Sequence, residues 1–303
     1  MLTQCEIQGI KLIIYRDDLN HPTVSGNKLH KLSPNIKLAK DKGVSQILSF
    51  GGAFSNHLHA LAWACKESGL QSIGVVRGEL HVPLTSTLKD CEEWGMKLMP
   101  ISRRAYREYQ EKLRHFAAPC SISDFNLNQI SQDIIVDENT LVLPEGGSNK
   151  IAIQSLANAY DKVFTKTDCK NITHAVCATG TGATLAGLYK AAPNNINLIG
   201  MQAVAEQHAT IDRINSWLGG EASRITIEES HLGRFAKTTT RLMEFIDSFE
   251  AKMSIELEPV YTGKAMLKLF EMIEANYFKQ GDEILFIHTG GLQGKRGFYR
   301  KAN

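Results

Sequence analysis

The sequence has 303 residues, of which 43% are hydrophobic and 22% are charged, and its 34 basic and 32 acidic side chains leave a formal net charge of +2. This composition is that of a packed globular protein and excludes an intrinsically disordered chain. Each half of the chain, divided at residue 150, holds 17 basic and 16 acidic residues, so there is no basic arm and we expect no nucleic-acid binding.

The longest apolar runs, residues 60–65 and 284–287, are far shorter than the ~20 residues that cross a bilayer, so we expect no membrane association. Residues 1–6 have neither a basic start nor an apolar core, so we predict no secretory signal and expect a cytoplasmic protein. Six cysteines lack any C-x-x-C spacing, which argues against a zinc site and a disulfide framework. We therefore predict no metal site.

From residue 44 onward, apolar runs alternate with amphipathic segments, a pattern that predicts strands alternating with helices. Such alternation implies an α/β fold with parallel sheets covered on both faces. Before residue 44, the segment 25–32 is interpreted as a polar loop, and residues 120–138 as a surface excursion. The predicted strands are 44–50, 71–76, 97–101, 141–144, 173–178, 196–204 and 283–287, and the predicted helices are 56–68, 84–93, 103–116, 149–164, 183–192 and 264–278.

Four glycine-containing turns follow predicted strands, at residues 51–57, 145–149, 179–184 and 288–291. Ligands of open parallel sheets bind beyond the carboxyl ends of the strands, so these turns are candidate binding sites. The turn at 179–184 also opens a helix, where backbone N–H groups, threonine hydroxyls and the helix dipole favour a phosphate.

A dinucleotide is the alternative ligand for this turn. Gly180 and Gly182 are followed by Gly187, so the spacing departs from the G-x-G-x-x-G pattern of nicotinamide-dependent dehydrogenases. Glu206 fits the acidic position of that pattern only loosely. Glycines that merely make tight turns explain the motif equally well when it is taken alone. Lys28, in the segment 25–32, is similarly ambiguous by itself, because a lysine can neutralise a phosphate, form an imine with an aldehyde cofactor or simply face solvent.

Taken together and in this order, five motifs resemble the 1-aminocyclopropane-1-carboxylate deaminase / D-cysteine desulfhydrase family of pyridoxal-phosphate enzymes. They are Gly26-Asn27-Lys28 and the segments 50–57, 179–184, 259–266 and 288–291, and the resemblance spans residues 10 to 292. It implies the tryptophan synthase beta-like fold (fold type II), with two three-layer α/β domains of mostly parallel sheets and the cofactor between them. The implied large domain is residues 1–33 and 147–303, the small inserted domain is residues 34–146, and the implied assembly is a homodimer.

The resemblance assigns Lys28 to a Schiff base with pyridoxal 5'-phosphate and to the transfer of the substrate proton. It places Ser55 and His57 at the substrate carboxylate, with Ser55 also counted as catalytic, and Asn56 at the substrate and the 3-oxygen of the cofactor. A helix start suits such an anion.

The resemblance gives the phosphate to Thr181, Gly182, Ala183 and Thr184, which accounts for the departure from the dinucleotide spacing. A single phosphate needs one helix start and its hydroxyls, not the third glycine of a pyrophosphate site.

By the same resemblance, Tyr261 faces the substrate as a catalytic group, and Thr262 or Thr289 lies near the pyridine nitrogen of the cofactor. Ring-opening deaminases carry glutamate at position 262, whereas desulfhydrase-like members carry threonine. Phe235, expected to contact the substrate, stands where many members have a second active-site tyrosine. A neutral hydroxyl near the nitrogen gives a weaker electron sink, which suits the elimination of a good leaving group.

The expected reaction is therefore α,β-elimination on a small amino acid, with D-cysteine as the leading substrate and pyruvate, ammonia and sulfide as products. Ring-opening deamination of 1-aminocyclopropane-1-carboxylate is the alternative within the enzyme class, and Thr262 and Phe235 count against it. A protein that binds pyridoxal phosphate or an amino acid without turnover is the alternative of another class, and Phe235 favours it.

Overall fold

The computed structural model describes residues 1–80, 82–114, 120–121, 136–204, 207–233 and 236–298. The described chain divides into two units, each with its own sheet. Unit 1 consists of Met1–His21, Ser25–Asn27 and Ile153–Phe298, and the described part of unit 2 consists of Pro22–Val24 and Lys28–Ala152. The domain limits expected from the resemblance, 33/34 and 146/147, stay a prediction.

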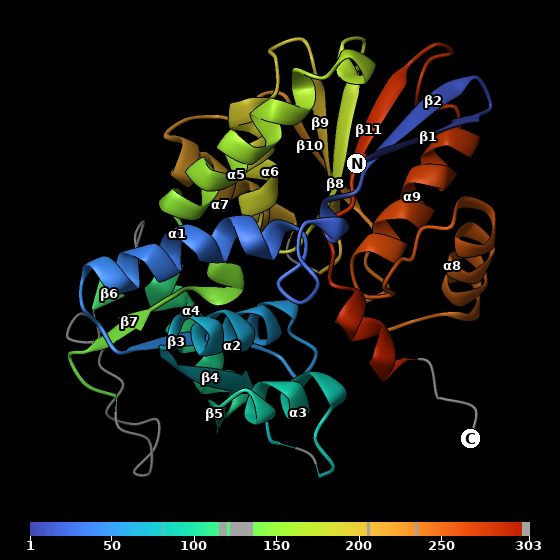
Figure 1. Cartoon of the computed structure of the whole chain (residues 1–303). Helices are drawn as coiled ribbons and strands as arrows, with labels where there is room; N and C mark the ends of the chain where they lie inside the picture. The colour runs from blue at the N-terminus through green and yellow to red at the C-terminus, as the bar shows by residue number, and fades with distance from the viewer. Residues whose placement is uncertain (81, 115–119, 122–135, 205–206, 234–235, 299–303) are drawn as a thin grey trace. The chain divides into compact units, whose positions relative to one another are not determined.

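Unit 1 contains a six-stranded sheet in the order β1-β2-β11-β8-β9-β10 (Figure 1). The first two strands form an antiparallel hairpin, whose turn residues Gln8 and Gly9 both have positive φ, as a two-residue hairpin turn requires. All other neighbours in this sheet are parallel. The strands are β1 Leu2–Ile7, β2 Ile10–Tyr15, β8 His174–Thr179, β9 Asn197–Gln202, β10 Ile225–Glu229 and β11 Glu283–Ile287.

Helices cover both faces of the unit 1 sheet, because successive side chains of each strand point to opposite faces. Ile13 and Leu285 pack with helices α5 (Lys150–Phe164), α6 (Ala183–Ala191) and α7 (Gln207–Leu218). Ile14 and Phe286, the next residues along the same strands, pack on the opposite face with α8 (Thr240–Met253) and α9 (Thr262–Glu274). Unit 1 is therefore a three-layer α/β structure.

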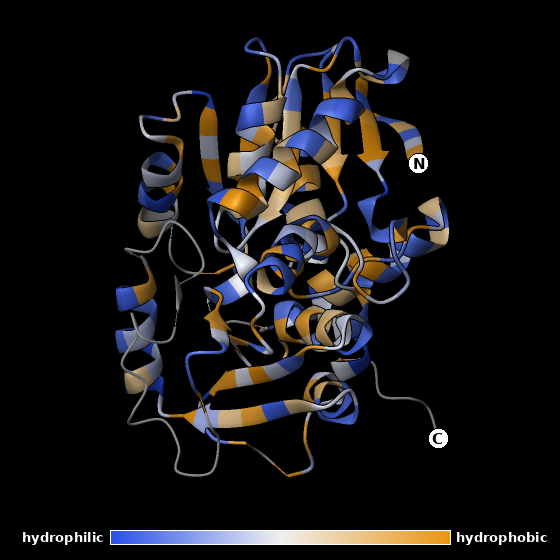
Figure 2. Ribbon diagram, turned by 60° about the vertical axis from the view of Figure 1, so that its left-hand side comes forward, coloured by the Kyte–Doolittle hydropathy of each residue, from blue (hydrophilic) through white to orange (hydrophobic). Residues whose placement is uncertain are grey.

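Unit 2 contains a five-stranded sheet in the order β5-β4-β3-β7-β6, parallel except for the β6–β7 pair. Ile47 and Val76 face helices α1, α2 and α3, whereas Leu48 and Val75 face α4. Figure 2 shows hydrophobic colour along the strands and alternating colours along the helices, as expected for half-buried helices. The elements are α1 Asn27–Asp41, β3 Gln46–Gly51, α2 Asn56–Ser68, β4 Gln71–Arg77, α3 Ser86–Glu93, β5 Met96–Ile101, α4 Arg103–Arg114, β6 Cys120–Ser121 and β7 Thr140–Val142.

The predicted α/β fold with mostly parallel sheets is confirmed. One expectation is wrong: residues 25–32 are not a polar loop, because the turn that ends at Gly26 leads directly into α1, and Lys28 lies in the first turn of that helix. Residues 122–135, most of the predicted surface excursion, lie outside the described residues. None of the helices in the described ranges combines the length and the apolar character that a membrane crossing requires.

Candidate active site

Asn27, the residue before Lys28, is anchored to two loops of unit 1. Its backbone N–H donates to the Thr289 carbonyl oxygen (3.3 Å), and its side-chain amide donates to Thr184 Oγ1 (2.8 Å). Gly26 has a φ of +66°, and a Cβ there would overlap the Thr289 carbonyl, so glycine permits this close approach. Because consecutive Cα atoms are about 3.8 Å apart, these contacts also fix the backbone at which the Lys28 side chain begins.

The loop after β8 has the features of a phosphate site. Gly182, with a φ of +97°, is the N-cap residue of α6, and no side chain caps this helix start. Its first N–H groups are therefore available to a ligand, and the helix dipole favours a negative charge there. Ala183 and the hydroxyl-bearing Thr184 are buried at this point. This donor set fits the phosphate group of pyridoxal phosphate.

Arg213 of α7 lies beside the same loop. Its Nε donates to the Thr181 carbonyl oxygen (3.2 Å), and its Nη2 donates to Thr210 Oγ1 (3.0 Å) in the same helix. The guanidinium thereby holds the loop backbone and brings a positive charge to it. Arg213 gives no signal in the sequence, because it is a lone arginine in a segment without a predicted element.

A buried carboxylate organises the start of α9. Glu258 accepts hydrogen bonds from the backbone N–H groups of Val260, Tyr261 and Thr262, each at 2.7 Å. Its own N–H donates to Thr262 Oγ1 (3.0 Å). Burial raises the pKa of Glu258, while these N–H groups and the charge of Lys264 act in the opposite direction. Glu258 therefore serves as the cap of α9 and fixes Tyr261 and Thr262.

Tyr261 meets the phosphate loop within unit 1. A Cβ built on Gly180 would lie 3.2 Å from Tyr261 Cε1, so the tyrosine ring packs directly against the backbone that follows β8. The predicted site residues Thr181–Thr184 and Tyr261 are thus brought to one edge of the sheet, the carboxyl ends of its parallel strands.

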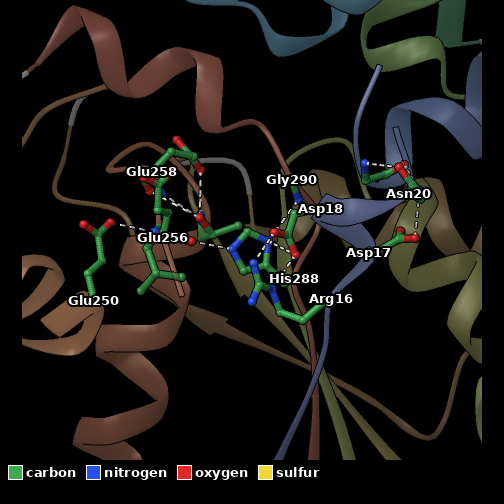
Figure 3. A network of polar contacts seen from close by, with 12 residues as sticks. Arg16, Asp17, Asp18, Asn20, Glu250, Glu256, Glu258, His288 and Gly290 are labelled. Carbon is green, nitrogen blue, oxygen red and sulfur yellow. Dashed lines mark hydrogen bonds and ion pairs between the residues drawn. The ribbon is translucent and has the colours of Figure 1, made fainter. Parts of the chain in front are cut away.

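A buried polar network holds the turn after β11 (Figure 3). Arg16 binds Asp18 through two hydrogen bonds (2.8 and 2.7 Å), and Asp18 Oδ1 lies 3.4 Å from His288 Nδ1. His288 Nε2 donates to the Glu256 carbonyl oxygen (2.7 Å), while Nδ1 accepts from the Gly290 N–H (3.3 Å). Burial lowers the pKa of His288, which favours this neutral form. The network fixes Thr289, which lies between His288 and Gly290.

In unit 2, the start of α2 presents a second anion-binding arrangement. Ser55 is the N-cap residue, and its hydroxyl accepts the Leu58 N–H (3.2 Å). Asn56 and His57 are the first residues of this 13-residue helix. The positive end of the helix dipole and the backbone N–H groups of its first turn suit a carboxylate.

Three basic side chains of unit 2 lie near one another. His57 is buried, and its pKa is well below the ordinary value because of burial first and of the charges of Lys28 and Lys31 second. Lys31 is also buried, and its ammonium group donates to Ser148 Oγ (3.5 Å). Lys28, His57 and the start of α2, which the sequence placed in separate motifs, therefore belong to one group.

The structure separates the predicted residues by unit. Asn27, Thr181–Thr184, Tyr261, Thr262 and Thr289 belong to unit 1, and Lys28, Ser55, Asn56 and His57 belong to unit 2. Phe235 lies outside the described residues. Sequence reasoning missed the roles of Asn27, Glu258 and His288, which lie in or beside quoted motifs, and that of Asp18, which lies outside them.

Comparisons with known proteins identify the family of this chain. The model of the family described as pyridoxal-phosphate dependent enzyme matches residues 4–290. A putative 1-aminocyclopropane-1-carboxylate deaminase of Pyrococcus horikoshii is 26% identical over 302 residues, covering 94% of this chain and 86% of the relative. A D-cysteine desulfhydrase of Salmonella schwarzengrund is 26% identical over 297 residues, covering 93% of this chain and 87% of the relative.

Solved structures share the fold. The structure described as an ACC deaminase homologue has a TM-score of 0.73 at 26% identity, covering 94% of this chain and 86% of that chain. A hydrogen sulfide-producing enzyme from Fusobacterium nucleatum has a TM-score of 0.64 at 12% identity, covering 99% and 96%, and this likeness concerns the fold alone. The predicted resemblance, the tryptophan synthase beta-like fold and the cofactor are confirmed. With a phosphate loop that fits and a family match over nearly its whole length, this chain belongs to the pyridoxal-phosphate dependent enzymes of fold type II.

Proposed function

We propose that this enzyme catalyses α,β-elimination on a small amino acid, with D-cysteine as the leading substrate and pyruvate, ammonia and sulfide as products. The observation that carries the proposal is the neutral hydroxyl of Thr262 at the capped start of α9, where the ring-opening deaminases of the resembled family have a carboxylate.

Several residues of the chain would hold the cofactor. Pyridoxal phosphate, when bound, draws electrons from the Cα of an attached amino acid and so eases loss of the Cα proton. The N–H groups at the start of α6 and the hydroxyls of Thr181 and Thr184 would bind its phosphate. Asn56 would contact its 3-oxygen, and Lys28 would hold its aldehyde carbon.

Lys28 would also take the proton from the substrate Cα, which requires its amine to be uncharged at that moment. The contacts of Asn27 support this role, because they fix the backbone beside Lys28 from two sides. Ser55, with the N–H groups of Asn56 and His57, would orient the substrate carboxylate. Tyr261, packed against Gly180, would face the substrate.

The surroundings of Thr262 support elimination over ring opening. Glu258 is the nearby carboxylate, but its two oxygens accept three backbone N–H groups at 2.7 Å. Glu258 is therefore occupied as a helix cap and does not replace the missing carboxylate of position 262. A threonine hydroxyl does not favour a proton on the cofactor nitrogen, and the weaker electron sink suits a substrate with a good leaving group, such as a thiol.

Ring-opening deamination of 1-aminocyclopropane-1-carboxylate is the second candidate, because relatives from Pyrococcus and Thermotoga carry that name as a putative activity. The two reactions give different products. Elimination on D-cysteine releases sulfide and pyruvate, whereas ring opening releases 2-oxobutanoate.

The test incubates the purified, cofactor-loaded enzyme with D-cysteine, L-cysteine and 1-aminocyclopropane-1-carboxylate, and measures sulfide, pyruvate and 2-oxobutanoate. We expect sulfide and pyruvate in equal amounts from D-cysteine. Faster formation of 2-oxobutanoate would contradict the proposal, and bound cofactor without any product would favour a binding protein.

Two lysine variants of helix α1 test the role of Lys28, one at Lys28 itself and one at an exposed lysine that serves as the control. Lys28→Ala is expected to lose the borohydride-sensitive visible absorption band and all turnover. Lys37→Ala, which removes an exposed lysine paired with Asp41 in the same helix, is expected to keep both. A Lys28→Ala protein that retained band and turnover would refute the assignment of Lys28.

The resemblance also leads us to propose a cytoplasmic homodimer with the domain division 1–33 plus 147–303 and 34–146. Light scattering on the purified protein would measure the mass of the assembly. A mass near 33.6 kDa, that of one chain, would contradict the dimer.

A further inference from the structure

His57 is held in one tautomer by Ser49. The Ser49 hydroxyl lies 2.7 Å from His57 Nε2 and donates to the Leu143 carbonyl oxygen (2.9 Å), with the Pro144 carbonyl oxygen also near (3.3 Å). A hydroxyl has one proton to donate. We assign that proton to a backbone carbonyl, so Ser49 accepts a hydrogen bond from His57 and the ring proton is assigned to Nε2.

The other ring nitrogen is then a bare acceptor. His57 Nδ1 is buried and has no hydrogen-bond partner. The charges of Lys28 and Lys31 act on the ring, and together with burial they oppose a second proton. A buried acceptor without a donor is unfavourable, so the arrangement calls for a donor from a ligand.

Gly147 borders the same edge of the ring. It has a φ of +64°, and a Cβ there would lie 3.2 Å from His57 Cε1 and 3.4 Å from Nδ1. Any residue with a side chain would therefore crowd this edge of the ring, so the close packing of the backbone against His57 calls for glycine. The same Cβ would lie 3.7 Å from the Cβ of Lys31, whose ammonium group donates to Ser148.

The chemistry of an amino-acid substrate limits which group can be the donor. The carboxylate has only lone pairs, so it suits the N–H groups at the start of α2 and would be repelled by a bare Nδ1. The amino nitrogen is used in the bond to the cofactor. A β-substituent that bears a proton, a thiol or a hydroxyl, remains.

We propose that His57 Nδ1 accepts a hydrogen bond from the proton-bearing β-substituent of the bound amino acid, which makes His57 a specificity-determining residue. This inference rests on the proposed function, because it concerns the same substrate and the same site. It sorts substrates by chemistry: thiol and hydroxyl amino acids gain the contact, whereas a halogen or methyl group at the β-position does not.

Two variants distinguish the roles of the two ring nitrogens of His57. His57→Gln places an amide N–H near the position of Nε2, so it keeps the Ser49 contact and loses the Nδ1 acceptor. His57→Asn places an amide oxygen near the position of Nδ1, so it keeps an acceptor and loses the Ser49 contact. Circular dichroism and thermal unfolding of both holoenzymes would establish that they are folded.

Binding is measured by the change in the visible absorption of the holoenzyme on titration with D-serine and D-alanine, which differ by one hydroxyl. We expect the unchanged enzyme and His57→Asn to bind D-serine roughly fivefold more tightly than D-alanine, the effect of one hydrogen bond. We expect His57→Gln to bind the two equally. The inference would be overturned if His57→Gln kept the full preference for D-serine over D-alanine, or if both variants lost that preference equally.

Turnover of D-cysteine and β-chloro-D-alanine separates this inference from the proposed function. Both substrates lose a good leaving group, but only D-cysteine carries a β-proton donor. His57→Gln should raise KM for D-cysteine severalfold and leave KM for β-chloro-D-alanine unchanged. No pyruvate from either substrate with the unchanged enzyme would refute the elimination while leaving the titration to test His57. An equal rise for both substrates would overturn the inference.

Discussion

Asn27 links the Thr184 hydroxyl and the Thr289 carbonyl through its side chain and its backbone. Asn27→Asp keeps the size of the side chain but replaces the donor by a negative acceptor. The Thr184 hydroxyl would then turn its proton toward residue 27, and a new negative charge would lie near the phosphate loop. We expect the affinity for pyridoxal phosphate to fall about tenfold or more, because an interaction with a charged group is worth ~1.4 kcal/mol or more.

Fluorescence titration of the apoenzyme with pyridoxal phosphate would measure this loss. Asn158→Asp, an exposed position on α5, is the matched control and should keep the original affinity. Equal affinity for Asn27→Asp and the control would show that the contact with Thr184 is dispensable.

Two buried cysteines are predicted to be chemically inert. Burial raises the pKa of Cys65 and of Cys91 to about 12, with the charge of Asp90 adding to the effect at Cys91. Only the thiolate reacts, and its fraction at pH 8 is then on the order of 10⁻⁴. Mass spectrometry after iodoacetamide treatment should find both thiols unmodified in the native protein and modified in urea. Equal labelling in the two conditions would contradict the burial of these side chains.

At the scale of single elements, the cap of α9 gives a stability prediction. Glu258→Ala would leave three backbone N–H groups without their acceptor, two of them buried and that of Tyr261 partly buried, at a cost of about 3 kcal/mol in the free energy of unfolding. Glu258→Gln keeps one oxygen for the Tyr261 and Thr262 N–H groups and leaves the Val260 N–H without its acceptor, so we expect a smaller loss of about 1 kcal/mol. Urea denaturation of both variants would measure the difference. Similar losses of stability in both variants would show that the charge of Glu258, and not its hydrogen bonds at the start of α9, stabilises the fold.

The same residue gives a pH dependence. The pKa of Glu258 is raised on folding from its ordinary value of 4.5, so the folded state binds a proton more strongly than the unfolded state. This contribution to stability is present below pH 4.5 and is lost as pH rises through the folded pKa. Glu258→Gln should remove the effect, so its stability relative to the unchanged protein should rise with pH above 4.5. A difference independent of pH would contradict the raised pKa.

The sequence predicted elements well where apolar periodicity and turn residues agree. Helix α2 and strand β11 have the predicted bounds, because Ser55 caps the first and five apolar or strand-compatible residues form the second. Helix α1 was missed, since it is polar and contains Pro34, which ordinarily breaks a helix. The β1–β2 hairpin was missed because its turn contains Gln8, an uncommon residue at positive φ.

The chemistry of the site was less predictable than its position. Glycine-rich turns at strand ends revealed the phosphate loop, but hydrogen bonds between distant residues carry no local signal. The contact of Asp18 with His288 joins residues 270 positions apart, and the Ser49–His57 contact depends on carbonyl groups that follow β7. Such partners become visible only when the sheets bring the strand ends together.

For the whole molecule, cofactor removal gives a further prediction. A ligand that binds only the folded state stabilises it by an amount that grows with concentration, about 2.7 kcal/mol at 100 times its dissociation constant. Adding pyridoxal phosphate to the apoenzyme should therefore raise the urea midpoint. Pyridoxal, which lacks the phosphate, should raise it less if the α6 loop supplies much of the affinity. Equal shifts would argue against a phosphate site at Thr181–Thr184.

The strand order of unit 1 also bears on how the chain is made. Strand β2 pairs with β11 in the register Lys11↔Glu283. Strand β2 therefore cannot form this pairing until β11 leaves the ribosome, some 270 residues later. The Lys28–Ala152 part of unit 2 is continuous and can form its sheet while synthesis proceeds. We therefore infer that the nascent chain completes the part that carries Lys28 first, and that the phosphate loop gains its full sheet only after β11 has been synthesised.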